Sequence, residues 1–300
     1  MGHDSRFGHL AAFVTIAIWG TTFISTKILL ADFQPIEILF FRFVLGFLAL
    51  CIVSPRRMQK LDGRQELTCV AAGLTGVCLY YLLENIALTY TLASNVGVIL
   101  SVAPCFTAIL TRLLSPGEEP LRPSFFAGFA VAMAGICLIS FQGGTLAIHP
   151  VGDLLAVLAA LLWAVYSVLT KKIGSFGCPT ILATRRVFFY GLLFMLPCLF
   201  LFDMNWDLTR FANPVYLFQI LFLGLGASAF CFVTWNFAVR VLGAVKTTIY
   251  IYMVPVITVA AAALVLHERI TGTAAVGAVM TLAGLAVSEY RPKQKPYQTK

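Results

Sequence analysis

Long apolar runs and short polar stretches alternate along the whole chain. Each run has about 18 to 25 residues, the length that a helix needs to cross ~30 Å of hydrocarbon. Lipid offers no partners to open backbone groups, so such runs must be helices or barrel strands, and runs this long without alternation exclude a barrel. The pattern predicts ten membrane-spanning helices, at residues 8–30, 36–53, 67–90, 93–113, 124–141, 153–172, 180–202, 216–240, 245–266 and 272–289.

The composition supports an all-α membrane protein and excludes a soluble one. Of the 300 residues, 60% are hydrophobic and only 11% are charged. About a quarter of the residues of a soluble domain are charged, because its surface must be solvated. The connections between the predicted spans are short, so they leave no room for a separate soluble domain.

Lysine and arginine are distributed unevenly over the predicted connections. With both termini in the cytoplasm, fifteen of the 21 Lys and Arg residues fall on the inner side, three on the outer side and three within spans. The basic tail at 291–300 belongs to the inner side. This bias follows the positive-inside rule and indicates that both termini are cytoplasmic. It also accounts for the net charge of +8 without a nucleic-acid partner.

The chain repeats itself after about half its length. Trp, Asn, Pro and charged positions recur in the same order at offsets of 144 to 151 residues, which chance rarely produces. The matched pairs include Trp19 with Trp163, Lys27 with Lys171, Arg42 with Arg186, Asn85 with Asn236, Pro104 with Pro255 and Glu119 with Glu268. We infer two five-helix units, residues 1–146 and 147–300. Because five is odd, the second unit enters the membrane from the opposite side, as in the inverted repeats of many secondary transporters.

Motifs for catalysis, metal binding and nucleotide binding are missing from the sequence. None of the four His residues belongs to an H-x-x-x-H or H-E-x-x-H pattern, and there is no Walker A loop. The eight Cys residues include no C-x-x-C pair, and seven of them lie in apolar runs, which is typical of small buried residues. We therefore expect no catalytic residue, no metal and no cofactor.

Several features resemble the EamA-type transporters of the drug/metabolite transporter superfamily. They are the Trp-containing first helix, the stretch Phe41-Arg42-Phe43, the prolines Pro104 and Pro255, and the ending LVLHERITGTAAVGAVMTLAG at 264–284. The resemblance covers essentially the whole chain and is nearest to the YddG-type bacterial exporters of aromatic amino acids. It implies efflux of Phe, Tyr, Trp and other neutral amino acids or amphipathic compounds from the cytoplasm.

The mid-membrane aromatic and polar residues are the candidates for substrate binding. Trp19, Tyr80, Tyr81, Trp163, Trp235 and Tyr250 would enclose an apolar side chain, and Glu84, Asn85, Asn236 and Lys246 would bind the amino and carboxylate groups. Trp19 and Trp163 are either cavity wall or helix-packing anchors. An intramembrane carboxylate faces a cavity or a partner, so Glu84 is either functional or ion-paired with Arg42. Lys246 either binds a substrate carboxylate or marks the inner membrane face.

Proline and small residues suggest where helices bend and where they pack. Pro104 and Pro255 should kink the fourth and ninth spans, and Gly97 adds freedom before Pro104. These positions are either hinges or static kinks. Small residues in the fifth and tenth spans favour close packing within the monomer, with dimerisation as the alternative. Arg185 and Arg186 lie near the inner boundary and are expected to snorkel to water.

Together these features predict a multi-pass secondary transporter of the bacterial inner membrane. A central cavity between the two units would take aromatic and neutral amino acids by alternating access, with a monomer expected and a dimer as the alternative. An exchanger of phosphorylated metabolites or nucleotide sugars would need several cations in the cavity, and a membrane enzyme would need paired acids or His residues near an interface. The driving force, whether proton coupling or facilitated diffusion, stays open.

Overall fold

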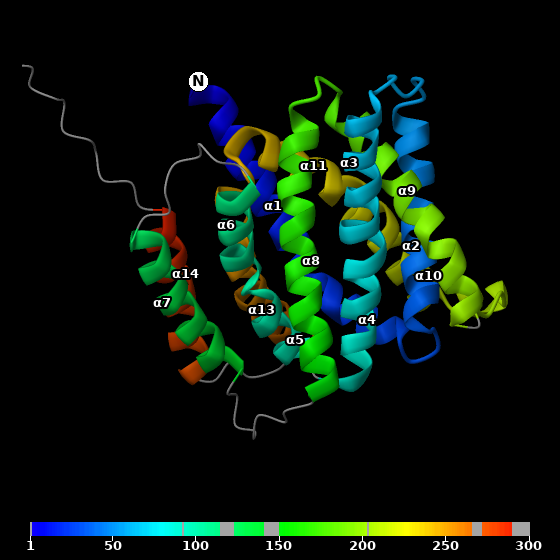
Figure 1. Ribbon diagram of the computed structural model, residues 1–300. Helices are drawn as coiled ribbons and strands as arrows, with labels where there is room; N and C mark the ends of the chain where they lie inside the picture. Colours follow the sequence, from blue (N-terminus) through cyan, green and yellow to red (C-terminus); the bar gives the residue numbers. More distant parts are fainter. Residues whose placement is uncertain are drawn as a thin grey trace, which may run out of the picture.

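The computed structural model describes residues 2–91, 93–114, 123–140, 150–202, 204–265 and 272–289. Within these ranges the chain is helical, with no strand (Figure 1). The matched residues Glu119 and Glu268 and the basic tail lie outside the described residues.

The first half consists of α1 (Gly2–Leu29), α2 (Pro35–Val53), α3 (Gly63–Gly73), η1 (Leu74–Leu79), α4 (Tyr80–Tyr90), α5 (Ala93–Leu100), α6 (Ala103–Leu114) and α7 (Pro123–Ser140). The second half consists of α8 (Pro150–Gly174), α9 (Thr180–Leu201), η2 (Leu208–Ala212), α10 (Pro214–Leu221), η3 (Phe222–Phe230), α11 (Cys231–Leu242), α12 (Ala244–Ile249), η4 (Tyr250–Tyr252), α13 (Met253–Val265) and α14 (Gly272–Glu289). The elements η1 and η3 are π-helical, and η2 and η4 are 3₁₀-helical.

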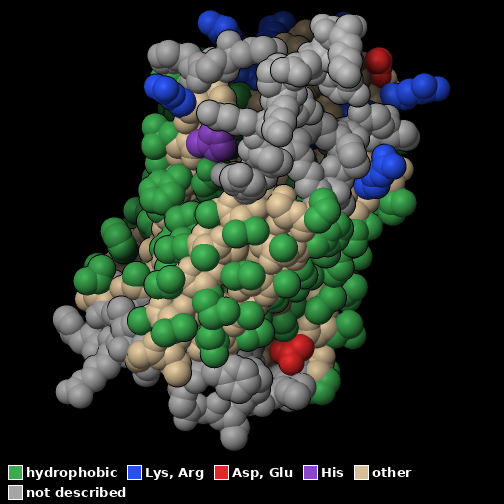
Figure 2. All heavy atoms as spheres, turned by 90° about the vertical axis from the view of Figure 1, so that its left-hand side faces the viewer, with side chains coloured by type: hydrophobic (Ala, Val, Ile, Leu, Met, Phe, Trp, Pro, Cys, Tyr) green, Lys and Arg blue, Asp and Glu red, His purple; other side chains and the backbone are tan. Residues whose placement is uncertain are grey.

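Within the described residues, seven helical stretches are long and apolar enough to cross a membrane: Ser5–Leu29, Pro35–Val53, Gly63–Tyr90, Val96–Leu114, Pro150–Gly174, Thr180–Leu201 and Pro214–Leu242. Three shorter apolar helices, Pro123–Leu138, Ala244–Thr258 and Ala275–Ser288, occupy the other expected spans. Figure 2 shows hydrophobic side chains covering the middle of one lateral face, with Lys and Arg gathered at one end. Exposed apolar residues such as Phe200, at 84%, would be in contact with lipid.

The α-helix is interrupted just before each of the two prolines for which a kink was predicted. The fourth span is interrupted at Ser101 and Val102, so Pro104 lies in the first turn of α6. The ninth span passes through the 3₁₀ turn η4, and Pro255 lies in the first turn of α13. A proline in the first turn of a helix removes an N–H that has no intrahelical partner, so the interruption absorbs the cost.

Glycines let helices from the two halves approach closely and reciprocally. A Cβ added to Gly46 of α2 would lie 3.2 Å from the carbonyl oxygen of Gly224 in η3. A Cβ added to Gly73 of α3 would lie 2.8 Å from the backbone nitrogen of Gly191 in α9. The second span therefore packs on the eighth, and the seventh packs on the third. The two π-helical elements, η1 and η3, lie at corresponding places in the third and eighth spans.

The small residues of α7 and α14 pack against each other within the monomer, as predicted (Figure 1). A Cβ on Gly284 would lie 2.6 Å from the carbonyl oxygen of Gly128. A Cβ on Gly135 would lie 2.5 Å from the carbonyl oxygen of Gly277, so the two helices run antiparallel. Only residues without bulky side chains allow backbones this close.

The prediction that Arg185 and Arg186 snorkel to water is wrong. The two residues are 6% and 8% exposed. Arg185 donates to the carbonyl oxygens of Ser54, the C-cap residue of α2, and of Arg56 in the following connection, each at 2.5 Å. Arg186 bonds the carbonyl oxygen of Gln59 and forms an ion pair with Glu66 at 3.0 Å. Arg185 and Arg186 thus hold the α2–α3 connection against α9.

A buried ion pair holds the α9–α10 connection onto α2. Glu37 is fully buried and accepts hydrogen bonds from the backbone N–H groups of Gln34 and Asn205, both at 2.8 Å. Arg210 donates to both carboxylate oxygens of Glu37, at 3.0 and 3.2 Å, and its guanidinium lies 4.2 Å from the centre of the Phe33 ring. The sequence gives no sign of this pair, because Glu37 looks like an ordinary charge in a first helical turn.

Glu37→Gln is expected to lower the free energy of unfolding by about 2–3 kcal/mol, because it leaves Arg210 without its charged partner. The measurement is the thermal midpoint of the detergent-purified protein, followed by the size-exclusion peak. Asp207→Asn is the matched control: Asp207 is exposed in the same connection and caps Thr209, which asparagine can also do. Equal midpoints for the two variants would show that the Glu37–Arg210 pair adds no stability.

Candidate functional site

A cavity lies between the two halves of the chain, and its empty space, counted together with the part open to solvent, is about 530 Å³. Its lining comes from α1, α4, α5, α6, α8, η4 and α13. Five of the predicted binding residues line it, namely Trp19, Tyr80, Tyr81, Glu84 and Trp163, and so does the predicted hinge residue Gly97. Among the described residues, the lining contains none from α10, η3 or α11, which form the predicted eighth span.

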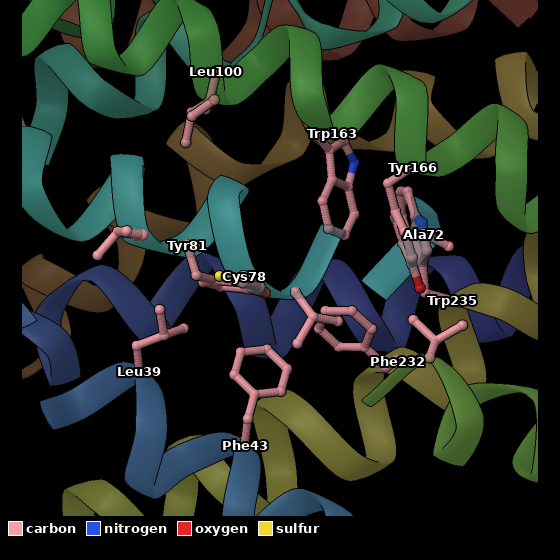
Figure 3. Packing of buried hydrophobic residues seen from close by; sticks show 14 of the residues in the cluster. Leu39, Phe43, Ala72, Cys78, Tyr81, Leu100, Trp163, Tyr166, Phe232 and Trp235 are labelled. Carbon is pink, nitrogen blue, oxygen red and sulfur yellow. The ribbon is translucent and has the colours of Figure 1, made fainter. Parts of the chain in front are cut away.

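Aromatic rings form one wall of the cavity. Trp163 of α8 lies with its ring centre 5.2 Å from that of Trp19 and 4.8 Å from that of Tyr80. Tyr80 in turn lies 4.6 Å from Tyr81. Figure 3 shows Trp163 and Tyr81 reaching from different helices toward one packed cluster, with Phe43, Phe232 and Trp235. Offset and edge-to-face ring pairs of this kind stabilise beyond their buried area.

The two matched tryptophans differ in how their indole N–H groups are bonded. Trp19 Nε1 donates to the carbonyl oxygen of Ala227 in η3, at 2.9 Å. Trp163 Nε1 is buried and finds no hydrogen-bond partner among the described residues. Trp19 therefore serves both as cavity wall and as a packing anchor between α1 and the eighth span, whereas Trp163 is held by ring packing.

Glu84 is the one acidic side chain in the lining given by the described residues. It is 6% exposed and has a side-chain hydrogen bond with Tyr80, and its Oε2 atom has no hydrogen-bond partner in the described part of the chain. Arg42 forms no ion pair with it in the described part of the chain. Arg42 Nε instead donates to Ser228 Oγ at 3.0 Å, and its guanidinium lies 4.4 Å from the centre of the Tyr81 ring. The direct Glu84–Arg42 ion pair that the sequence left open is therefore not formed.

Five predicted binding residues lie outside this cavity. Asn85 Nδ2 donates to the carbonyl oxygen of Pro35 at 3.2 Å. Asn236 accepts from the Tyr166 hydroxyl at 2.7 Å and donates to Thr184 at 2.9 Å. Trp235 is fully buried and packs on Trp19, with ring centres 5.1 Å apart. Tyr250 contacts His9 at 2.7 Å, and Lys246 lies on α12 away from the lining.

Seven further described residues, six of them apolar, line the cavity and were not predicted from the sequence. They are Ile16, Thr22, Phe23, Leu100, Ala103, Ile251 and Val254. Apart from Thr22, they resemble the residues that face lipid, so no signal in the sequence distinguishes them. The hydroxyl of Thr22 donates to the carbonyl oxygen of Trp19 within α1.

The apolar spans around an aromatic cavity define a helical membrane transport protein, and the comparison with known families agrees. The model of the EamA-like transporter family matches residues 6–141 and 150–290. The chain belongs to this family and is a transporter, not an enzyme.

Relatives with known names cover nearly the whole chain. An "Uncharacterized transporter" from Archaeoglobus fulgidus is 30% identical, over 95% of this chain and 98% of the relative. A "Probable terminal-alkyne amino-acid exporter" from Streptantibioticus cattleyicolor is 25% identical, over 94% and 93%. A "Probable amino-acid metabolite efflux pump" from Escherichia coli is 24% identical, over 95% and 96%.

A solved structure titled "Crystal structure of protein" has the same fold. Its TM-score is 0.73, over 94% of this chain and 96% of that chain, at 21% sequence identity. At this identity the likeness extends to the fold alone.

Proposed function

We propose that this transporter exports aromatic and other neutral amino acids, together with amphipathic compounds, from the cytoplasm across the inner membrane of a bacterium. The cavity carries this proposal: ring faces of Trp19, Trp163 and Tyr80 suit an apolar side chain, and Glu84 suits an amino group. The names of the Escherichia coli and Streptantibioticus cattleyicolor relatives refer to amino acids and support the same substrate class.

The proposed mechanism is alternating access by two inverted five-helix units in a monomer of ten spans with cytoplasmic termini. Three observations support it. The family model matches the chain twice, the second and seventh spans pack reciprocally on the eighth and third, and both units have a π-helical element and a proline-associated break at corresponding places. Two units that exchange conformations give two states of nearly equal free energy, which alternating access requires.

Gly97→Ala tests the proposed hinge before Pro104. A Cβ at Gly97 would meet no atom within 4 Å, so alanine fits, and it favours a helix by about 1 kcal/mol over glycine. We expect the thermal midpoint to stay equal or rise while the transport rate falls several-fold, because the break between α5 and α6 loses freedom. An unchanged rate would indicate a static kink.

The direct test of the proposed function is counterflow of labelled phenylalanine into proteoliposomes that hold the purified protein, beside protein-free liposomes. Uptake that unlabelled tryptophan abolishes and glucose phosphate does not is the expected result. Competition by glucose phosphate instead would favour a metabolite exchanger. Uptake no greater than in protein-free liposomes would contradict amino-acid transport.

A further inference from the structure

The charge of the cavity lining is one-sided. Among its residues in the described part of the chain, Glu84 is acidic and none is Lys, Arg or His. We propose that the cavity recognises the ammonium group of its substrate and discriminates against a free carboxylate. Arylalkylamines and amides of aromatic amino acids are then better ligands than the amino acids with the same side chain. This inference rests on the proposed function and narrows its substrate class.

Glu84 has no cationic partner among the residues that the structure describes. Glu84 is buried, its Oε2 atom has no hydrogen-bond partner among the same residues, and Tyr80 supplies a neutral contact. A buried carboxylate in this condition has lost water without receiving a matching cation, which is unfavourable. A protonated amine in the cavity would provide both the charge and the N–H donors that Glu84 lacks.

The nearest guanidinium is not available to a substrate carboxylate. Arg42 is 2% exposed, lies over the ring of Tyr81 and bonds Ser228, and it is not a lining residue. It moderates the field of Glu84 from within the protein, while Glu84 itself belongs to the lining. The lining therefore offers a ligand a negative charge and, among the described residues, no positive one.

The ring faces beside Glu84 favour a cation as well. The ring centre of Tyr80 lies 4.6 Å from that of Tyr81 and 4.8 Å from that of Trp163. The faces of aromatic rings attract ammonium groups. The polar groups that a ligand carboxylate could use are weaker. Trp163 Nε1 is a neutral donor and the Thr22 hydroxyl is bonded within α1, so the charge of the carboxylate would stay uncompensated beside Glu84.

Four ligands that share an indole ring separate the effect of the ammonium group from that of the carboxylate. They are the cations tryptamine and tryptophanamide, the zwitterion tryptophan and the anion indole-3-propionate. Their binding to the detergent-purified full-length protein is measured by equilibrium dialysis at neutral pH. We expect both cations to bind at least tenfold more tightly than tryptophan, and the anion to bind most weakly. Glu84→Gln should reduce amine affinity about tenfold and bring the probes to nearly equal affinity.

Asp62→Asn is the matched control, since it removes an exposed carboxylate remote from the cavity and asparagine can retain the N-cap of α3. It should keep the wild-type ranking, and a sharp size-exclusion peak shows that each variant is folded. Tryptophan binding as tightly as tryptamine, or a ranking that persists in Glu84→Gln, would overturn the ammonium site while amino-acid transport stands. Tight binding of the two amines without binding of tryptophan would support the ammonium site and contradict amino-acid export. Binding of none of the four would overturn both.

Discussion

Trp163→Ala is expected to reduce phenylalanine counterflow at least tenfold. The Trp163 ring lies at the centre of the cavity wall, with ring centres 5.2 Å from Trp19, 4.8 Å from Tyr80 and 5.1 Å from Tyr166. Each such pair contributes roughly 0.5–1.5 kcal/mol beyond burial. Alanine removes all of them, widens the cavity and leaves a substrate ring without a stacking surface.

Two further variants separate the cavity wall from general stability. Large-to-small changes of buried aromatics cost about 3–5 kcal/mol, so the thermal midpoint of Trp163→Ala must be measured beside its transport rate. Trp163→Phe keeps an aromatic face and loses an N–H that has no partner, so we expect it to retain at least half of the transport. Trp206→Ala is the matched control, because Trp206 is 60% exposed and outside the lining. A folded Trp163→Ala protein with normal transport would contradict the proposed cavity.

The helical fold could be predicted because the membrane restricts what an apolar run can become. Seven expected spans appear as long apolar helices, and the other three appear as shorter ones. The kinks at Pro104 and Pro255 were also predictable, since proline lacks the N–H that a helix interior uses. Their location one turn earlier depends on how neighbouring helices accommodate the break, which hydropathy does not encode.

The candidate site was predictable only in part, because a polar residue in a membrane can either line a cavity or form hydrogen bonds with another helix. Glu84 lines the cavity, and its Oε2 atom has no hydrogen-bond partner among the described residues. Asn85, the next residue, instead donates to the carbonyl oxygen of Pro35, the first residue of α2. Asn236 is likewise bonded within the protein, to Tyr166 and Thr184. Both asparagines satisfy groups on other helices, and those partners are known only once the helices are packed.

The arginines illustrate the same limit at the ends of the helices. A snorkelling residue and a capping residue have identical sequence context near the membrane boundary. Arg185 and Arg186 are drawn inward by backbone carbonyls at 54–59 and by Glu66, which come from a distant connection. The matched residue Arg42 instead lies over Tyr81, so one position of the repeat serves two different structural roles.

Gly284→Leu is expected to prevent the folded protein from accumulating, because the added side chain would clash with backbone atoms of α7. A Cβ at this position would lie 2.4 Å from the backbone nitrogen of Ala132 and 2.6 Å from the carbonyl oxygen of Gly128. Real Cβ atoms do not come this close, and α7 and α14 would have to separate. Since lipid is as apolar as leucine, the lost helix–helix contacts are not regained by hydrophobic burial elsewhere.

Ala283→Leu supplies the control for this change, since Ala283 is the exposed neighbour of Gly284 on the same helix. It adds the same side chain to the membrane-facing surface, so the yield of monodisperse protein should match the wild type. For Gly284→Leu we expect at least a tenfold loss of the monodisperse size-exclusion peak from equal amounts of membrane. Equal yields from the two variants would mean that α7 and α14 separate without cost, and that their close packing does not hold the last helix in place.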